Sequence, residues 1–83
     1  MIHFVTSRQS YDQLVASSAW PPDSLWVALG VLSPAELTGL RANGLAVTDF
    51  TTSISSHNLA EALETIREHH PGEAVWVDGA AEA

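Results

Sequence analysis

The longest apolar segment that shows no alternation runs from Leu25 to Val31, Leu-Trp-Val-Ala-Leu-Gly-Val. Apolar side chains pointing to both sides of a strand indicate that both faces of its sheet are covered, as in a parallel sheet between helices. We therefore expect this strand, with Trp26 inside it, to be the centre of a small α/β domain.

Three shorter segments predict the remaining strands. Ile2–Thr6 is β-branched and aromatic, and Leu45–Phe50 is apolar at its start and more polar at its end. Ala74–Val77 is apolar on both faces. Runs of this length and composition, bounded by polar turns, are typical of short strands.

A helical period follows the first of these strands. Ser10 stands three residues before Gln13, the spacing of a capping box, so we expect Ser10 to be the N-cap. The helical face that follows consists of Tyr11, Leu14, Val15 and Ser18. Pro21 and Pro22 end this helix because proline cannot donate a backbone hydrogen bond.

Two further helices have clear boundaries. Ser33-Pro34-Ala35-Glu36 combines an N-cap serine, a proline in the first turn and a glutamate that closes a capping box. That helix ends at Asn43-Gly44. Asn58 and Glu61 predict a second capping box, and Pro71-Gly72 ends the helix that it opens.

The element order is therefore β-α-β-α-β-α-β. Connections of this length favour right-handed crossovers, so we expect one α/β domain over residues 1–79. Its four-stranded, mostly parallel sheet is flanked by three helices, with the strand order left open. After the turn at Asp78-Gly79, residues 80–83 are expected to be a frayed tail.

Charge narrows the range of partners. The chain has ten acidic residues, three arginines and no lysine, which gives a net charge of −7. Binding of nucleic acid depends on basic side chains that displace counterions from phosphates, so direct nucleic-acid binding is not expected. The acidity either keeps a small domain in solution or is directed at a basic partner.

The sequence also indicates the compartment. It contains no cysteine, so disulfides and thiolate metal sites are excluded. Apolar runs stop well short of the roughly 18 residues that span a bilayer, and the first residues lack a basic signal-peptide start. We expect a soluble, cytoplasmic protein with no membrane contact.

The third predicted helix carries the strongest candidate for a binding surface. Glu61, Glu64 and Glu68 lie at i, i+3 and i+7, and Arg67 alone offsets them. This stripe is either a solvated helix face or an acidic docking surface. Trp20, beside two prolines, is either an exposed interface anchor or an aromatic ring that folds back over the sheet edge.

A second candidate lies where the loops after the strands converge. Ligands of open α/β sheets bind at the carboxyl ends of the strands, near helix N-termini. Ser7, Arg8, Ser55 and His57 follow strands and could bind a phosphate or another anion there. The sequence contains no glycine-rich phosphate loop.

Other arrangements give no catalytic or metal centre. Ser53 or Ser55 with His57 and Asp49 lies within one loop, and no strained nucleophile turn accompanies them. The adjacent His69 and His70 point about 100° apart on a helix, so they are not a metal-ligand pair and instead fit a helix C-terminus. No cofactor and no metal are expected.

These observations favour a non-enzymatic, acidic protein-binding module of the inhibitor, antitoxin, immunity or adaptor kind. Its partner would have a basic surface, such as that of a protein that handles nucleic acid. The alternative is a small-ligand domain that binds an anion at the carboxyl edge of the sheet. A homodimer through an open sheet edge is a third option.

Overall fold

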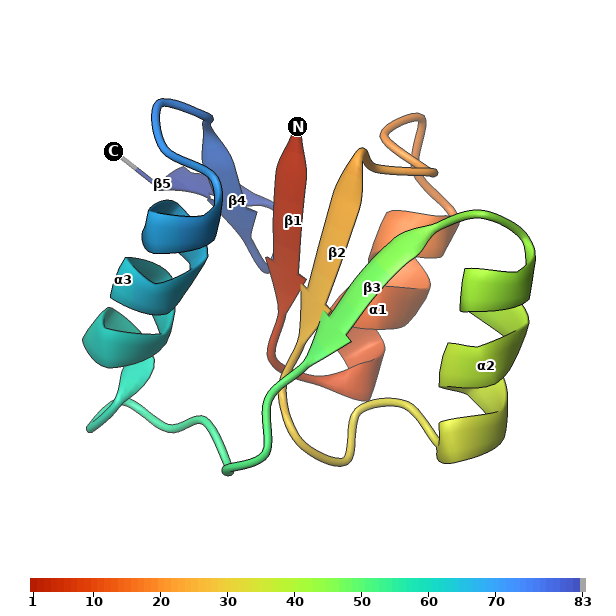
Figure 1. The fold of residues 1–83 in the computed structure, drawn as a ribbon, viewed down its shortest axis with the longest axis horizontal. Coiled ribbons are helices and arrows are strands. Elements are labelled where there is room, and N and C mark those ends of the chain that lie inside the picture. Colours follow the sequence, from red (N-terminus) through yellow and green to blue (C-terminus); the bar gives the residue numbers. More distant parts are fainter. Residues whose placement is uncertain (83) are drawn as a thin grey trace.

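A five-stranded sheet organises the computed structural model, which describes residues 1–82 of the chain, with side chains described through residue 80 (Figure 1). The elements in chain order are β1 (Ile2–Val5), α1 (Arg8–Val15), β2 (Ser24–Val27), α2 (Pro34–Ala42), β3 (Ala46–Asp49), α3 (Leu59–His69), β4 (Val75–Val77) and β5 (Ala80–Glu82).

The strand order in the sheet is β3-β2-β1-β4-β5. The chain adds β2 and β3 on one side of β1 and then reverses direction to add β4 and β5 on the other side. The first four strands are mutually parallel, and β5 pairs antiparallel with β4. The α/β order and the three helices agree with the sequence-based prediction. Right-handed crossovers place α1 and α2 on one face of the sheet and α3, which returns the chain past β1, on the other (Figure 1).

The middle strand of the sheet is β1, and not the segment Leu25–Val31 that the sequence favoured. All four residues of β1 are buried. Phe4 points to the α3 side, where its ring lies 5.4 Å from that of Phe50. The alternate residues His3 and Val5 point to the α1 side and line a cavity beside that helix.

The strand predicted over Leu25–Val31 is shorter than expected. Strand β2 ends at Val27, and Gly30 turns the chain with a φ of +82°. Val31 and Leu32 are nevertheless buried. The apolar run is therefore continuous because the loop after the strand also packs into the core, which hydrophobic pattern alone does not distinguish from a longer strand.

Two of the three predicted helix starts need correction. Ser7, and not Ser10, is the N-cap of α1; Ser10 occupies the third helical position and completes the capping box with Ser7. Asn58 precedes α3 but makes no side-chain cap bond, and its side chain instead bonds within the preceding loop, to Ser53 and Ser55. The capping box of Ser33 and Glu36 is confirmed.

The predicted frayed tail is a strand in the structure. Asp78 and Gly79 both have positive φ, 48° and 87°, which suits a two-residue hairpin turn. The turn brings Ala80–Glu82 alongside β4 as β5. Strands β3 and β5 are thus the two edges of the sheet, and a homodimer through either of them remains a prediction.

Candidate functional site

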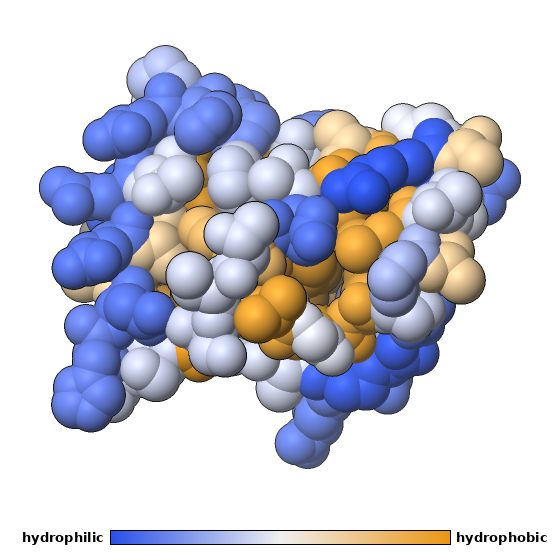
Figure 2. All heavy atoms as spheres, turned by 60° about the horizontal axis from the view of Figure 1, so that its bottom comes forward, coloured by the Kyte–Doolittle hydropathy of each residue, from blue (hydrophilic) through white to orange (hydrophobic). Residues whose placement is uncertain are grey.

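The acidic residues of α3 differ from the other acidic residues in having no partner. Glu61, Glu64 and Glu68 are all exposed. Within the described part of the chain, their carboxylates take part in no hydrogen bond and no ion pair. Figure 2 shows a hydrophilic surface on the side of the molecule where α3 lies, next to a band of apolar residues in the middle of this face.

Every other acidic side chain that the structure describes has a partner. The pairs are Asp12 and Glu36 with Arg8, Asp23 with the N-terminal ammonium, Asp49 with Arg41, Glu73 with His70, and Asp78 with Thr6 and Ser10. Unpaired negative charge among these described side chains is consequently concentrated on one helix.

A shallow hollow of about 150 Å³ adjoins the first turn of α3. Phe50, Ile54 and Ala62 form its apolar part, and Glu61 lies at its polar side. A hollow that combines an apolar part with a carboxylate matches the two parts of a lysine or arginine side chain, an aliphatic stem and a charged head. The hollow and the acidic stripe therefore offer complementary contacts to the same kind of group.

Trp20 does not lie on this surface. Its ring packs edge-on against the ring of Tyr11 on α1, with 5.9 Å between the centroids, and it contacts the hydrophobic core. Because α1 and α3 cover opposite faces of the sheet, the structure does not bring Trp20 together with the glutamates. Trp20 is therefore partly buried against α1, whereas the sequence allowed either an exposed interface anchor or a ring folded back over the sheet edge.

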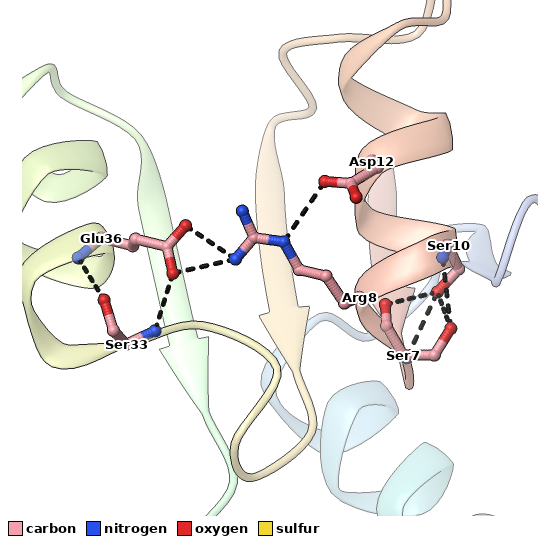
Figure 3. Close-up of polar contacts among 6 residues, drawn as sticks. All are labelled: Ser7, Arg8, Ser10, Asp12, Ser33 and Glu36. Carbon is pink, nitrogen blue, oxygen red and sulfur yellow. Dashed lines mark hydrogen bonds and ion pairs between the residues drawn. The ribbon is translucent and has the colours of Figure 1, made fainter.

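Arg8 is held by the protein's own carboxylates. Its guanidinium lies 2.7 Å from Glu36 on α2 and 3.3 Å from Asp12 on α1 (Figure 3). The hydrogen bond to Glu36 raises the pKa of Arg8. The pKa of Glu36 is lowered, first by the backbone N–H of Ser33 and then by Arg8. Arg8 thus joins the N-terminal turns of two helices, and its charge is already balanced.

The carboxylate of Asp78 lies at the carboxyl ends of β1 and β4, the two neighbouring strands between which the direction of the chain reverses. Ligands of open α/β sheets bind between the carboxyl ends of the strands at this point, here β1 and β4. Asp78, directly after β4, accepts hydrogen bonds from the N–H of Thr6 at 2.8 Å and from the hydroxyls of Thr6 and Ser10 at 2.5 and 2.7 Å. Ser7 bonds to Ser10 as the helix cap (Figure 3). The backbone N–H of Thr6 and the hydroxyls of Thr6, Ser7 and Ser10 are therefore already engaged.

The other two residues of the predicted anion site lie before α3. The hydroxyl of Ser55 accepts from the N–H of His57, and the N–H of Ser55 donates to Asn58. Asp49, considered with these residues as part of a catalytic triad, binds Arg41 at 3.2 Å. The structure therefore assembles no Ser-His-Asp arrangement from this loop.

The pair His69 and His70 has a role in packing that the sequence did not indicate. The indole N–H of Trp26 donates to Nε2 of His70 at 3.2 Å, and Nδ1 of His70 lies 3.2 Å from Glu73. The ring of His69 also packs edge-on against Trp26. These contacts join the end of α3 to β2, whereas the sequence suggested an interaction with the helix dipole.

A cavity beside α1 was not predicted from the sequence. It has a volume of about 350 Å³ and lies beside α1, over β1 and β4. His3 and Trp76 contribute to its wall, and their rings stack at 6.0 Å between centroids. Sequence patterns did not single out His3, because a histidine between apolar residues of a strand resembles a core position.

The described residues form no metal site, and similarity to known proteins indicates no function for the chain. Among the side chains of residues 1–80, no three from His, Asp or Glu are grouped as a metal ion requires. No described helix has both the length and the apolar character needed to cross a bilayer. Searches against protein-family models, curated proteins and solved structures find no match to the chain.

Proposed function

We propose that this protein is a non-enzymatic binding module that docks on a basic partner protein through α3. The observation that supports the proposal is the concentration of unpaired charge: Glu61, Glu64 and Glu68 are exposed and have no partner among the described side chains. Like charges at this spacing cost a helix a few tenths of a kcal/mol each in isolation. Basic side chains of a partner would offset the repulsion between these carboxylates and be attracted to them.

The hollow beside Glu61 supplies a contact that charge alone does not. A lysine or arginine of the partner would lay its aliphatic stem against Phe50 and Ile54 and direct its charged head to the carboxylate. Such a side chain would bury apolar surface and form a charge-assisted hydrogen bond at once. We therefore expect a protein surface with protruding basic side chains to be preferred over a diffuse positive field.

The acidic surface is also expected to govern the kinetics of association. Complementary potentials raise association rates, and their effect falls as salt shortens the Debye length, which is about 8 Å at physiological ionic strength. An exposed stripe is fully subject to this screening. Binding through α3 should consequently weaken as salt rises, mainly through a slower association rate.

A comparison of three baits tests the proposal. The first is the unaltered protein, the second carries Glu61→Gln, Glu64→Gln and Glu68→Gln, and the third carries Asp12→Asn, Asp23→Asn and Glu73→Gln. Both variants lose three negative charges, so they differ in where the charge is removed and not in how much. Circular dichroism verifies that each bait is folded before it is mixed with host lysate.

The proposal expects a stoichiometric basic protein that is retained by the unaltered bait and the third bait and lost from the second. The partner is then purified and its association rate measured at rising salt. Equal capture by all three baits, or an association rate that does not depend on salt, would contradict docking through α3.

A further inference from the structure

The cavity beside α1 exists because the chain reverses its winding at β1. Helices α1 and α2 follow the strands that run from β1 to β3, and α3 crosses to the opposite face of the sheet. On the α1 side, no described helix covers β4. The cavity lies in this gap. Its volume of about 350 Å³ is within the size range of small-molecule pockets.

Two residues that line this cavity each carry a nitrogen atom that has no hydrogen-bond partner within the described structure and no surface open to the cavity. Nε2 of His3 and Nε1 of Trp76 are both shielded from solvent. The His3 side chain is 4% exposed, whereas Trp76 is only partly buried. Buried polar groups are almost always paired in folded proteins, so two unpaired ring nitrogens on neighbouring strands call for an explanation.

The rings that carry these two nitrogens lie side by side because of the strand register. His3 and Trp76 are direct partners in the parallel pair β1–β4, and their rings are nearly parallel, with 14° between their planes. Indole N–H is a donor, and a neutral imidazole nitrogen is a donor or an acceptor according to its tautomer. Burial, assisted by the nearby N-terminal ammonium, lowers the pKa of His3 and favours the neutral ring.

The remaining wall indicates the polarity of a ligand. Met1, Val5, Leu14 and Ala19 provide apolar contact, and Gln13 and Ser17 are neutral. The one carboxylate in the described lining belongs to Asp78, which is held by Thr6 and Ser10. No arginine contributes to the described lining, and the N-terminal ammonium of Met1 is already paired with Asp23, so the cavity offers no free cation to an anionic ligand.

We propose that this cavity binds a flat, uncharged heteroaromatic molecule that has both a ring hydrogen-bond acceptor and an N–H donor. The acceptor receives the indole N–H of Trp76, and the donor bonds to Nε2 of His3. The Trp76 ring, the less buried of the two, turns aside to admit the ligand, and this movement opens both nitrogens to the acceptor and the donor of the ligand. This site is separate from the acidic surface of α3, which lies across the sheet.

Nitrogen-15 NMR of the indole groups tests the proposal, with benzimidazole as the probe and 1-methylbenzimidazole as its matched control. Benzimidazole has one ring acceptor and one N–H donor, and the methyl group of the control replaces that donor. Trp76→Phe assigns the Trp76 signal. The Trp26 signal serves as an internal reference, because Trp26 is bonded to His70 on the other face.

His3→Phe isolates the hydrogen bond, and Trp20→Phe is the control for a general effect of aromatic substitution. We expect benzimidazole to shift the Trp76 signal in a saturable way and to leave the Trp26 signal in place. Its dissociation constant should rise about 3- to 10-fold in His3→Phe, which is the factor for one hydrogen bond. 1-Methylbenzimidazole should bind the unaltered protein about 3- to 10-fold more weakly than benzimidazole does.

His3→Phe should remain folded, so that weaker binding by this variant reports the lost hydrogen bond and not unfolding. Phenylalanine matches the shape of the ring and removes the unpaired nitrogen, so the variant should unfold at the same urea concentration as the unaltered protein or at a higher one. Absence of a saturable Trp76 shift at 10 mM benzimidazole would overturn the proposal. So would equal affinity of the two probes, or equal affinity of His3→Phe and the unaltered protein.

Discussion

The carboxylate of Asp78 binds both the backbone N–H and the hydroxyl of Thr6, which joins the carboxyl ends of β4 and β1. The two residues lie 72 positions apart in the chain. Ser10 of α1 donates to the same carboxylate. One side chain thus secures the sheet centre, the start of α1 and the hairpin that leads to β5.

Asp78→Ala should therefore lower the free energy of unfolding by about 2 kcal/mol, since hydrogen bonds to a charged group contribute about 1.5–3 kcal/mol and the left-handed backbone at this position disfavours alanine. Urea unfolding followed by circular dichroism measures the change. Glu64→Gln, at an exposed position without a partner, is the control and should change stability by less than about 0.5 kcal/mol. Similar losses in both variants would contradict this role of Asp78.

A second prediction concerns the bond between Trp26 and His70. Trp26 is 5% exposed, so His70→Phe leaves a buried indole N–H without an acceptor and should cost about 1–2 kcal/mol. His70→Gln keeps an acceptor at this position and should recover part of the loss. Urea unfolding of both variants measures the difference, and equal stabilities would show that the bond contributes little.

The pH dependence of stability follows from His3. Burial lowers the pKa of His3 in the folded state below its ordinary value of 6.5, so the unfolded chain binds more protons as the pH falls past that value. Stability from the neutral ring is present above about pH 6.5 and is lost on acidification. The free energy of unfolding should therefore fall more between pH 7.5 and 5.5 in the unaltered protein than in His3→Phe. Since the two proteins differ only at residue 3, the difference between the two curves is the quantity to compare.

A fourth prediction concerns Arg8 and Glu36. Arg8→Gln removes an ion pair and should raise the pKa of the Glu36 carboxyl toward its ordinary value. Part of the lowering should persist, because the backbone N–H of Ser33 makes the largest contribution to it. A carbon-13 NMR titration of the side-chain carboxyl measures both effects.

The same variant examines the anion site that the sequence suggested. If the contacts of Arg8 are already taken by carboxylates, thermal stabilisation by inorganic phosphate should be equal in Arg8→Gln and in the unaltered protein. A phosphate effect that disappears with Arg8 would instead show that the guanidinium exchanges Glu36 for the ligand.

The elements of this fold that could be predicted were those encoded locally. Ser33-Pro34-Ala35-Glu36 determines a helix start by contacts within four residues, and the structure has that capping box. Ser7 and Ser10 show the limit of this reasoning. Each serine can cap a helix, and the choice of Ser7 depends on where β1 ends.

The features of the candidate sites that escaped prediction depend on strand order. The stacking of His3 on Trp76 requires β1 beside β4, and neither residue indicates its neighbour in the sequence. The ion pair between Arg8 and Glu36 likewise forms only because α2 lies beside α1. In contrast, the exposure of the glutamates on α3 follows from helical period alone and was predictable.

The position of β1 at the centre of the sheet has a consequence for synthesis of the chain. β1 is made early, yet its partner β4 is made some seventy residues later, at Val75–Val77. Until then one edge of β1, with the apolar Ile2 and Phe4, is free to pair with any strand that it meets. A nascent chain that has reached α3 but not β4 is therefore the species most prone to aggregate, and conditions that slow translation before residue 75 should increase its loss.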